Sequence, residues 1–197
     1  MPTSNVRASL YAVTDRGRTR DHNEDTFLVA DLATGEPIRE SRPEAHTVGE
    51  RGALYLVADG MGGAAAGEIA SEMAAVAIHE HMASAWREDA DHSEDRFAHH
   101  LVQAVERANE ILHAYAGEHH EVRGMGTTAT VAGVHGDRLY IAQIGDSRGY
   151  LVRGDIARQL TRDQSLTQRL VEVGELTEEE AEASERRNII LQALGPD

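Results

Sequence analysis

Cysteine is absent from this sequence of 197 residues. That absence excludes disulfide bonds, zinc sites built on thiolates and every mechanism with a cysteine nucleophile, including the cysteine class of phosphatases. Long hydrophobic runs are missing too, because no stretch approaches the roughly 18 apolar residues of a membrane span and the first residues carry no apolar signal-peptide core. We therefore expect a cytoplasmic protein that neither spans a membrane nor is secreted.

Positive charge is scarce, with 19 lysines and arginines against 34 acidic residues and a formal net charge of −15. This balance argues against nucleic acid or an anionic membrane as a partner. A phosphorylated substrate would need a basic group placed locally at the site. The length suits one domain with a real core, so we predict a single domain over 1–197 and a monomer.

Strand-like and helix-like segments are grouped along the chain rather than strictly alternating. Apolar periodicity and turn residues predict strands over 9–17, 25–31 and 52–60, a polar loop over 32–51, helices over 69–86 and 97–115, and hairpins that turn at Gly136-Asp137 and at Arg153–Asp155. Residues 161–187 are charged and only weakly helical. The clustered histidines, at 79, 81, 99, 100, 119 and 120, lack zinc-ligand spacing, and we expect them to be solvated.

Asp59 ends an apolar strand and is followed by glycines at 60, 62 and 63. A phosphate-binding P-loop is ruled out because Glu68 and Ile69 stand where lysine and a hydroxyl residue belong. A dinucleotide site needs a second strand where this chain has a helix, and Asp59 would repel a pyrophosphate, so an NAD-binding oxidoreductase is a distant third hypothesis. A metal site suits a rigidly held carboxylate beside glycines that turn the backbone and offer a carbonyl oxygen.

Further carboxylates stand at comparable places. Glu24 and Asp25 lie beside Arg20 at the mouth of an adjoining strand, and Asp146 ends another strand in a glycine-aspartate pair. Oxygen ligands without cysteine or a histidine pair favour Mg²⁺ or Mn²⁺ over zinc. We expect Arg148 to pair with a neighbouring carboxylate rather than to act in chemistry.

Five stretches together resemble a known family. "TDRGRTRDHNED", "LYLVADGMGG", the "EIAS" that follows it, "GMGTTATV" and "IAQIGDSRGYL" occur in the order and spacing of the metal-dependent PPM-type (2C-class) protein serine/threonine phosphatases in their bacterial form. The resemblance covers nearly the whole chain. It implies an α+β fold, a four-layer α/β/β/α sandwich of two antiparallel sheets flanked by antiparallel helices.

The resemblance also implies roles for single residues. Asp59 matches the acid that bridges two metal ions, Gly60 lends its carbonyl, and Glu24 completes one ion. Asp25 matches an acid that supports the site through water, Asp146 matches the acid of a weaker third metal position, and Arg20 matches the arginine that holds the substrate phosphate. In such a site the metal ions activate a water that attacks phosphorus directly, without a phosphoenzyme.

Two departures from the family pattern bear on catalysis. Met61 and Ala64 stand where family members often carry the histidine that protonates the leaving group, so His22 or a water would take that role. The chain also ends at Asp197, before the family's closing strands with their "SDG" and "DN" aspartates. Residues 161–187 correspond to the family's variable flap, beside the site, which we expect to be mobile and to choose substrates.

The function that follows is hydrolysis of phosphoserine and phosphothreonine in proteins, opposing a bacterial serine/threonine kinase. The expected partners are therefore phosphorylated proteins, among them kinases and their substrates. The alternative is a catalytically impaired, phosphatase-like domain that binds phosphoproteins or regulates a partner. On either reading we expect Thr127 and Thr128 to be mainly strand residues and Met61 to serve packing.

Overall fold

A six-stranded antiparallel sheet forms the centre of the molecule in the computed structural model, which describes residues 6–38, 43–62 and 66–196. The strands run in the order β3-β2-β5-β7-β8, and β6 pairs with the end of β5. Their bounds are β2 (Asp25–Asp31), β3 (Pro37–Ile38), β5 (Ala53–Met61), β6 (Gly126–Thr127), β7 (Ala129–His135) and β8 (Arg138–Ile144). The predicted strands over 25–31 and 52–60 are thus confirmed as β2 and, within one residue at each end, as β5.

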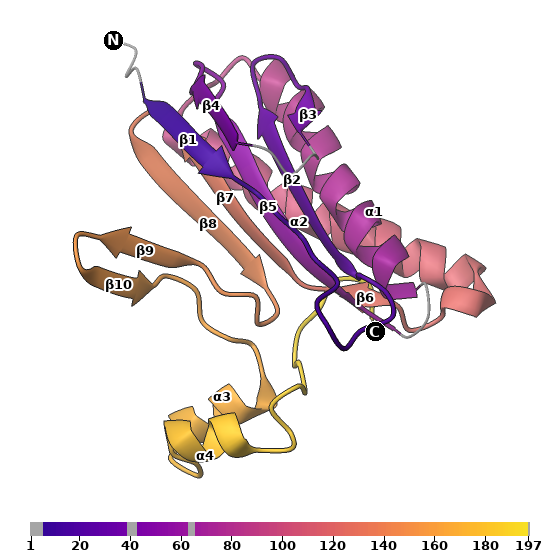
Figure 1. Cartoon of the computed structure of the whole chain (residues 1–197). Coiled ribbons are helices and arrows are strands. Elements are labelled where there is room, and N and C mark those ends of the chain that lie inside the picture. The colour runs from indigo at the N-terminus through magenta and orange to yellow at the C-terminus, as the bar shows by residue number, and fades with distance from the viewer. Residues whose placement is uncertain (1–5, 39–42, 63–65, 197) are drawn as a thin grey trace.

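Two helices, α1 (Ala66–His81) and α2 (Glu94–Glu118), cover one face of this sheet (Figure 1). Alanines on α1 let the helix lie close to the strands, and Ala70, Ala74 and Ala75 are completely buried there. A π-helical turn, η1 (Met82–Trp86), extends α1 and buries Trp86 against Phe97 of α2. Both helices were predicted, and their shared core with the sheet holds the large buried side chains of the molecule.

Helix α2 begins at Glu94, directly after Ser93 and the charged residues that follow α1. The Ser93 side chain accepts a hydrogen bond from the Arg96 amide, and Glu94 and Asp95 in the first turn suit the positive end of the helix dipole. Its buried stripe follows helical spacing through Phe97, Leu101, Ala104, Ala108 and Leu112. This stripe faces α1 and the sheet.

Two small antiparallel sheets lie on the other side of the main sheet. One pairs β1 (Arg7–Tyr11) with β4 (Pro43–Thr47), and the other pairs β9 (Tyr150–Arg153) with β10 (Ile156–Gln159). Side chains of β1, β9 and the open face of the main sheet surround a cavity of about 460 Å³. The α+β class with antiparallel sheets and a helix layer is confirmed.

The strand prediction for the N-terminal region was partly wrong. The strand predicted over 9–17 ends at Tyr11, because the polar residues after it turn back at Gly17, whose amide donates to Asp15. The predicted loop over 32–51 contains β3 and β4. These short strands exist because β2 and β1 offer them edges to pair with, and such distant pairing leaves little trace in local sequence.

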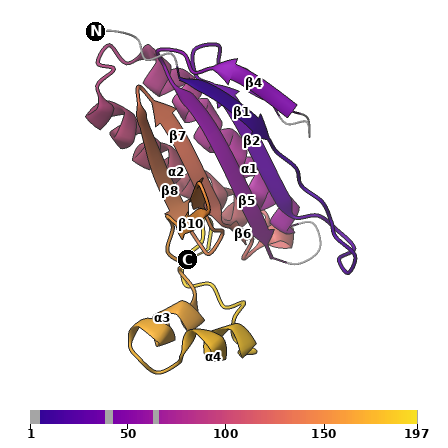
Figure 2. The same ribbon diagram turned by 60° about the vertical axis from the view of Figure 1, so that its left-hand side comes forward.

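The C-terminal segment leaves the sheet and returns to it. Helices α3 (Leu166–Glu172) and α4 (Glu178–Ala183) project beyond the end of the main sheet, away from α1 and α2 (Figure 2). The chain then comes back to β6, where Thr127 and Leu194 exchange two backbone hydrogen bonds of 3.1 and 2.9 Å. The weakly helical character predicted for 161–187 is confirmed, whereas its role as a flap stays a prediction.

The prediction that the clustered histidines are solvated was wrong for two of them. His79 and His100 are buried, and His79 Nε2 lies 3.0 Å from the Gly35 carbonyl. His100 Nε2 lies 2.8 Å from Asp89 Oδ2, while its Nδ1 lies 3.2 Å from His81 Nε2. Hydrogen-bond partners of this kind make the burial of an imidazole tolerable, and they come from segments that local spacing does not connect.

In the described ranges, no helix is both long and apolar enough to cross a membrane.

Candidate metal centre

Asp25 and Asp59 lie directly opposite each other where β2 and β5 pair. Side chains of directly opposed residues in an antiparallel pair share one face of the sheet and lie close together. That face is the one away from the helices, because Ala58 and Gly60, the neighbours of Asp59 in the strand, are buried on the helix side. The two aspartates line a cavity of about 200 Å³ together with Ser147 and parts of β2 and β5.

Partial burial, together with nearby acids, raises the pKa of the Asp59 carboxyl group to about 6. Partial desolvation is the first cause, although the residue stays open to solvent on one side. The charge of Asp25 and a hydrogen bond between the two carboxyl groups come next, followed by the charges of Asp146 and Glu24. Asp25, Asp146 and Glu24 therefore all act on Asp59, and a cation placed beside Asp59 would relieve that repulsion.

Glu24 is held against the first turn of α1. Its carbonyl accepts a hydrogen bond of 3.0 Å from the Gly60 amide, and a Cβ built on Gly67 would lie only 2.5 Å from Glu24 Oε1. A Cβ on Gly60 would lie 1.9 Å from the Gly67 carbonyl oxygen. Only glycine allows strand, helix and carboxylate to approach this closely. This packing role of Gly67 was not predicted, because it depends on Gly60 and Glu24 lying beside the helix.

Two threonines fix the backbone of Asp59. The Thr128 hydroxyl accepts from the Asp59 amide at 3.0 Å, and the Asp59 carbonyl accepts from the Thr128 amide at 2.9 Å and the Thr127 hydroxyl at 3.0 Å. Both threonines are completely buried. Thr127 ends β6, whereas Thr128 lies between β6 and β7, so the strand position expected for both is confirmed for Thr127 alone. Their bonds to Asp59 were not predicted, because they join residues 68 and 69 positions apart in the sequence.

Asp146 lies in the loop after β8, where it lines a neighbouring cavity of about 450 Å³ and its charge acts on Asp59. Burial is the main cause that raises the pKa of its carboxyl group, with Asp163 adding to the effect and Arg148 opposing it. Its neighbour Ser147 places its hydroxyl 2.8 Å from that of Thr128. Arg148 forms an ion pair of 2.6 Å with Asp163, which confirms the prediction that Arg148 pairs with a carboxylate.

Arg20 and His22 lie on the surface near Glu24 in sequence. Both are exposed in the loop that joins β1 to β2, and neither lines the cavity beside Asp25 and Asp59. In the part of the chain that the structure describes, neither side chain makes a hydrogen bond or ion pair. Their predicted roles with phosphate and the leaving group remain predictions.

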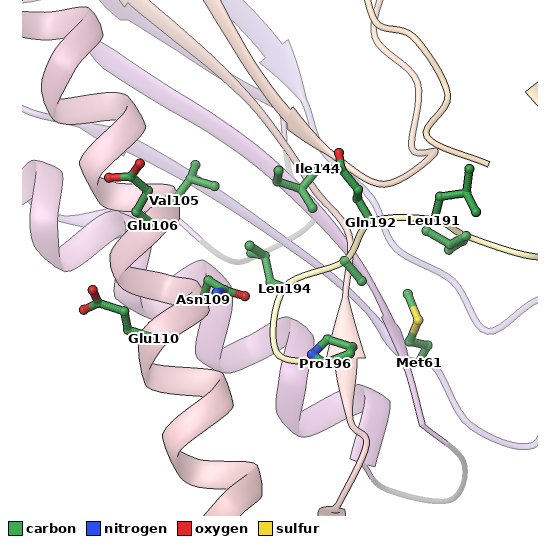
Figure 3. A pocket seen from close by; sticks show the side chains of 12 residues that line it. Met61, Val105, Glu106, Asn109, Glu110, Ile144, Leu191, Gln192, Leu194 and Pro196 are labelled. Atoms are coloured by element: carbon green, nitrogen blue, oxygen red, sulfur yellow. The ribbon is translucent and has the colours of Figure 1, made fainter. Parts of the chain in front are cut away.

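Met61 lines a separate cavity of about 730 Å³, which the returning C-terminal segment borders (Figure 3). It is half-buried there near Leu191 and Pro196, in keeping with the packing role expected for it. On the far wall, Asn109 of α2 accepts a hydrogen bond of 2.9 Å from the Gly195 amide. Ala64, the other position where a histidine is lacking, lies outside the described residues.

The donors at this centre fit a hard divalent cation. All are carboxylates, and hard cations such as Mg²⁺ and Mn²⁺ prefer oxygen ligands. Among residues 6–38, 43–62 and 66–196, no three histidine, aspartate or glutamate side chains form one group able to hold a metal ion. What the structure presents is the Asp25–Asp59 pair, with Glu24 and Asp146 close enough to shift the pKa of Asp59.

Comparison with known proteins places the chain among phosphatases of one family. Residues 42–193 match the family described as protein phosphatase 2C. A serine/threonine phosphatase, stp, from Listeria innocua is 38% identical over 183 residues, covering 92% of this chain and 65% of its own length. This chain therefore spans less than two thirds of the length of that relative.

Solved structures of related phosphatases share the fold. The serine/threonine phosphatase Stp1 from Staphylococcus aureus has 30% identity and a TM-score of 0.78, covering 100% of this chain and 69% of its own. The catalytic domain of the serine/threonine protein phosphatase PstP, in complex with two manganese ions, has 33% identity and a TM-score of 0.70, covering 96% and 68%. With a family match over most of its residues, this chain belongs to the protein phosphatase 2C family.

Proposed function

We propose that this chain provides the metal-dependent centre of a protein serine/threonine phosphatase, which hydrolyses phosphoserine and phosphothreonine in proteins. The observation that carries the proposal is the opposed pair Asp25 and Asp59 at the ends of β2 and β5, on the open face of the sheet. The named phosphatase relatives over 92% of the chain support the same reaction.

Asp59, Asp25 and Glu24 would hold two divalent cations, Mg²⁺ or Mn²⁺, with the Gly60 carbonyl as a further ligand. Asp146 would serve a third, weaker ion. When bound, such ions lower the pKa of a coordinated water, which supplies a nucleophile at neutral pH. The two manganese ions in the PstP structure support the choice of metal.

Other residues of the chain hold Asp59 in place, bind the substrate phosphate and donate a proton to the leaving group. Thr127 and Thr128 hold the backbone of Asp59 through both its amide and its carbonyl, so the carboxylate is fixed before any substrate arrives. Arg20 lies four residues before Glu24 with its guanidinium unpaired among the described residues, which leaves that group available to bind two phosphate oxygens. His22, on the same loop, would donate a proton to the departing hydroxyl group.

The proposed substrates are phosphorylated proteins in the cytoplasm, including serine/threonine kinases and their targets. We propose that the phosphatase acts on them as a monomer. Residues 161–187 would act as the flap that chooses among them. The alternative is a domain that binds phosphoproteins without turnover. One observation favours it, since no three acidic or histidine side chains form a single metal-holding group in the described ranges.

Hydrolysis of p-nitrophenyl phosphate and of a phosphothreonine peptide by the full chain tests the proposal. We expect turnover only with added Mn²⁺ or Mg²⁺, and no turnover in excess chelator. Tight peptide binding without turnover at any metal concentration would select the non-catalytic alternative. Full activity in excess chelator would contradict the metal-dependent mechanism.

A further inference from the structure

Two glutamines hold the residue that precedes Asp146. The Gly145 amide donates a hydrogen bond of 2.7 Å to Gln164 Oε1. The Gly145 carbonyl accepts from the Gln164 amide at 3.0 Å and from Gln143 Nε2 at 3.1 Å. We call Gln143 and Gln164 the glutamine clamp. It satisfies both backbone groups of Gly145 with partners from outside the loop.

The clamp fixes Gly145 in a position that sets the geometry of the metal centre. Gly145 has a φ of +98°, which favours glycine, and a Cβ there would lie 2.6 Å from the Thr128 side chain. Thr128 is the residue that holds the Asp59 amide. On the other side of Asp146, the Ser147 hydroxyl contacts that of Thr128 at 2.8 Å. The separation of Asp146 from Asp59 therefore depends on where Gly145 rests.

The same clamp holds both ends of segment 161–187. Gln143 Oε1 accepts a hydrogen bond of 2.9 Å from the Arg162 amide, at the start of the segment. The Gln164 carbonyl accepts one of 2.7 Å from the Leu191 amide, just after its end. Helices α3 and α4 project from this base, beyond the end of the main sheet (Figure 1). Movement of the base would reach Gly145 through the two glutamine side chains and through the Gln164 backbone amide.

We propose that Gln143 and Gln164 are positioning residues that couple metal binding at Asp146 to the mobility of the flap, residues 161–187. The inference rests on the proposed function, because it assumes that Asp146 faces a bound cation. A cation that draws Asp146 into place also fixes Gly145, and the clamp passes that restraint to the base of the flap. By linkage, a substrate that orders the flap strengthens metal binding by the same factor.

Mn²⁺ binding followed by electron paramagnetic resonance, and hydrogen exchange of the flap with and without Mn²⁺, test the coupling in the full chain. Gln164→Met keeps the side-chain length and removes the acceptor for the Gly145 amide. We expect Mn²⁺ to slow exchange across α3 and α4 in the wild-type chain. In Gln164→Met we expect this slowing to disappear and one class of Mn²⁺ sites to weaken by about 10-fold, the order of one lost hydrogen bond.

Gln159→Met is the matched control, because the Gln159 side-chain amide donates to Thr161 and Asp163 and, among the described residues, makes no hydrogen bond to Gly145. It should bind Mn²⁺ as the wild type does. Gln143→Met removes the side-chain bonds to the Gly145 carbonyl and to the Arg162 amide. This variant provides a second test of the coupling if Gln164→Met fails to fold. A role limited to stability would lower the melting temperature and leave the Mn²⁺-dependent slowing in place.

The outcomes separate the inference from the proposed function. If the wild type binds Mn²⁺ and both clamp variants keep wild-type affinity and wild-type slowing of exchange, the coupling is overturned while the metal centre stands. If the wild type binds no Mn²⁺, the proposed metal-dependent function fails, and the coupling fails with it.

Discussion

The two faces of the main sheet differ in what they contribute. On the face under α1 and α2, the strand β5 buries Leu54, Leu56 and Ala58 to 2% exposure or less. On the opposite face, Val57 of the same strand is 48% exposed and Leu139 of β8 is 49% exposed. Alternating residues of one strand thus serve a closed core and an open surface. Asp59 belongs to the open series.

The difference shows how a rigid support and an accessible site are combined in one strand. Packing under the helices fixes the backbone of β5, and the threonine hydrogen bonds fix it again at Asp59 itself. The open face keeps Asp25 and Asp59 within reach of water, cations and substrate. We expect substitutions on the helix face to lower stability and substitutions of acids on the open face to remove metal binding.

The two faces should differ most in how much a substitution lowers the free energy of unfolding, as Leu56→Ala and Val57→Ala would show. Loss of the buried Leu56 side chain should lower the free energy of unfolding by about 2–5 kcal/mol, because it leaves a cavity under the helices. The neighbouring Val57→Ala change should cost less than about 1 kcal/mol, since its side chain is half exposed. Urea unfolding of both variants measures the difference. Equal losses would mean that the open face is packed in solution.

A smaller effect is expected from Arg20→Ala on the open face. A guanidinium that binds phosphate in the ground state as well as the transition state should, when removed, raise KM by roughly 10-fold with little change in kcat. Arg18→Ala, in the same exposed loop, is the matched control and should leave KM unchanged. Steady-state kinetics on a phosphopeptide give both constants. Unchanged KM with lost Mn²⁺ binding would make Arg20 a structural residue instead.

Much of the fold was predictable where local pattern and tertiary packing agree. The strand over 25–31 matches β2, and the two helices follow their apolar periodicity, because in each case one face meets a core. The short strands β3 and β4 were missed because they depend on edges supplied by distant segments. Burial of His100 was missed for the same reason, since its partners Asp89 and His81 become neighbours only when α1 and α2 pack.

The acids of the site were more predictable than the residues that hold them. Asp25 and Asp59 stand out in sequence, since Asp25 begins one apolar strand and Asp59 follows the apolar run of another. Thr128 and Gln164 do not, because each acts on a backbone group far along the chain, 69 residues away for Thr128 and 19 for Gln164. A polar side chain that completes a distant hydrogen bond resembles any surface residue until the fold is known.

The central claim is that the acids on the open face, with Asp59 at their centre, bind divalent cations. Titration of the full chain with Mn²⁺, followed by loss of the free-ion electron paramagnetic resonance signal, tests it without requiring turnover. We predict that Asp59→Asn weakens binding by more than about 100-fold, beyond the loss typical of an outer-shell residue. The control Asp31→Asn, at the opposite end of β2, should bind as the wild type does. Wild-type affinity in Asp59→Asn, or an equal loss in both variants, would contradict the claim.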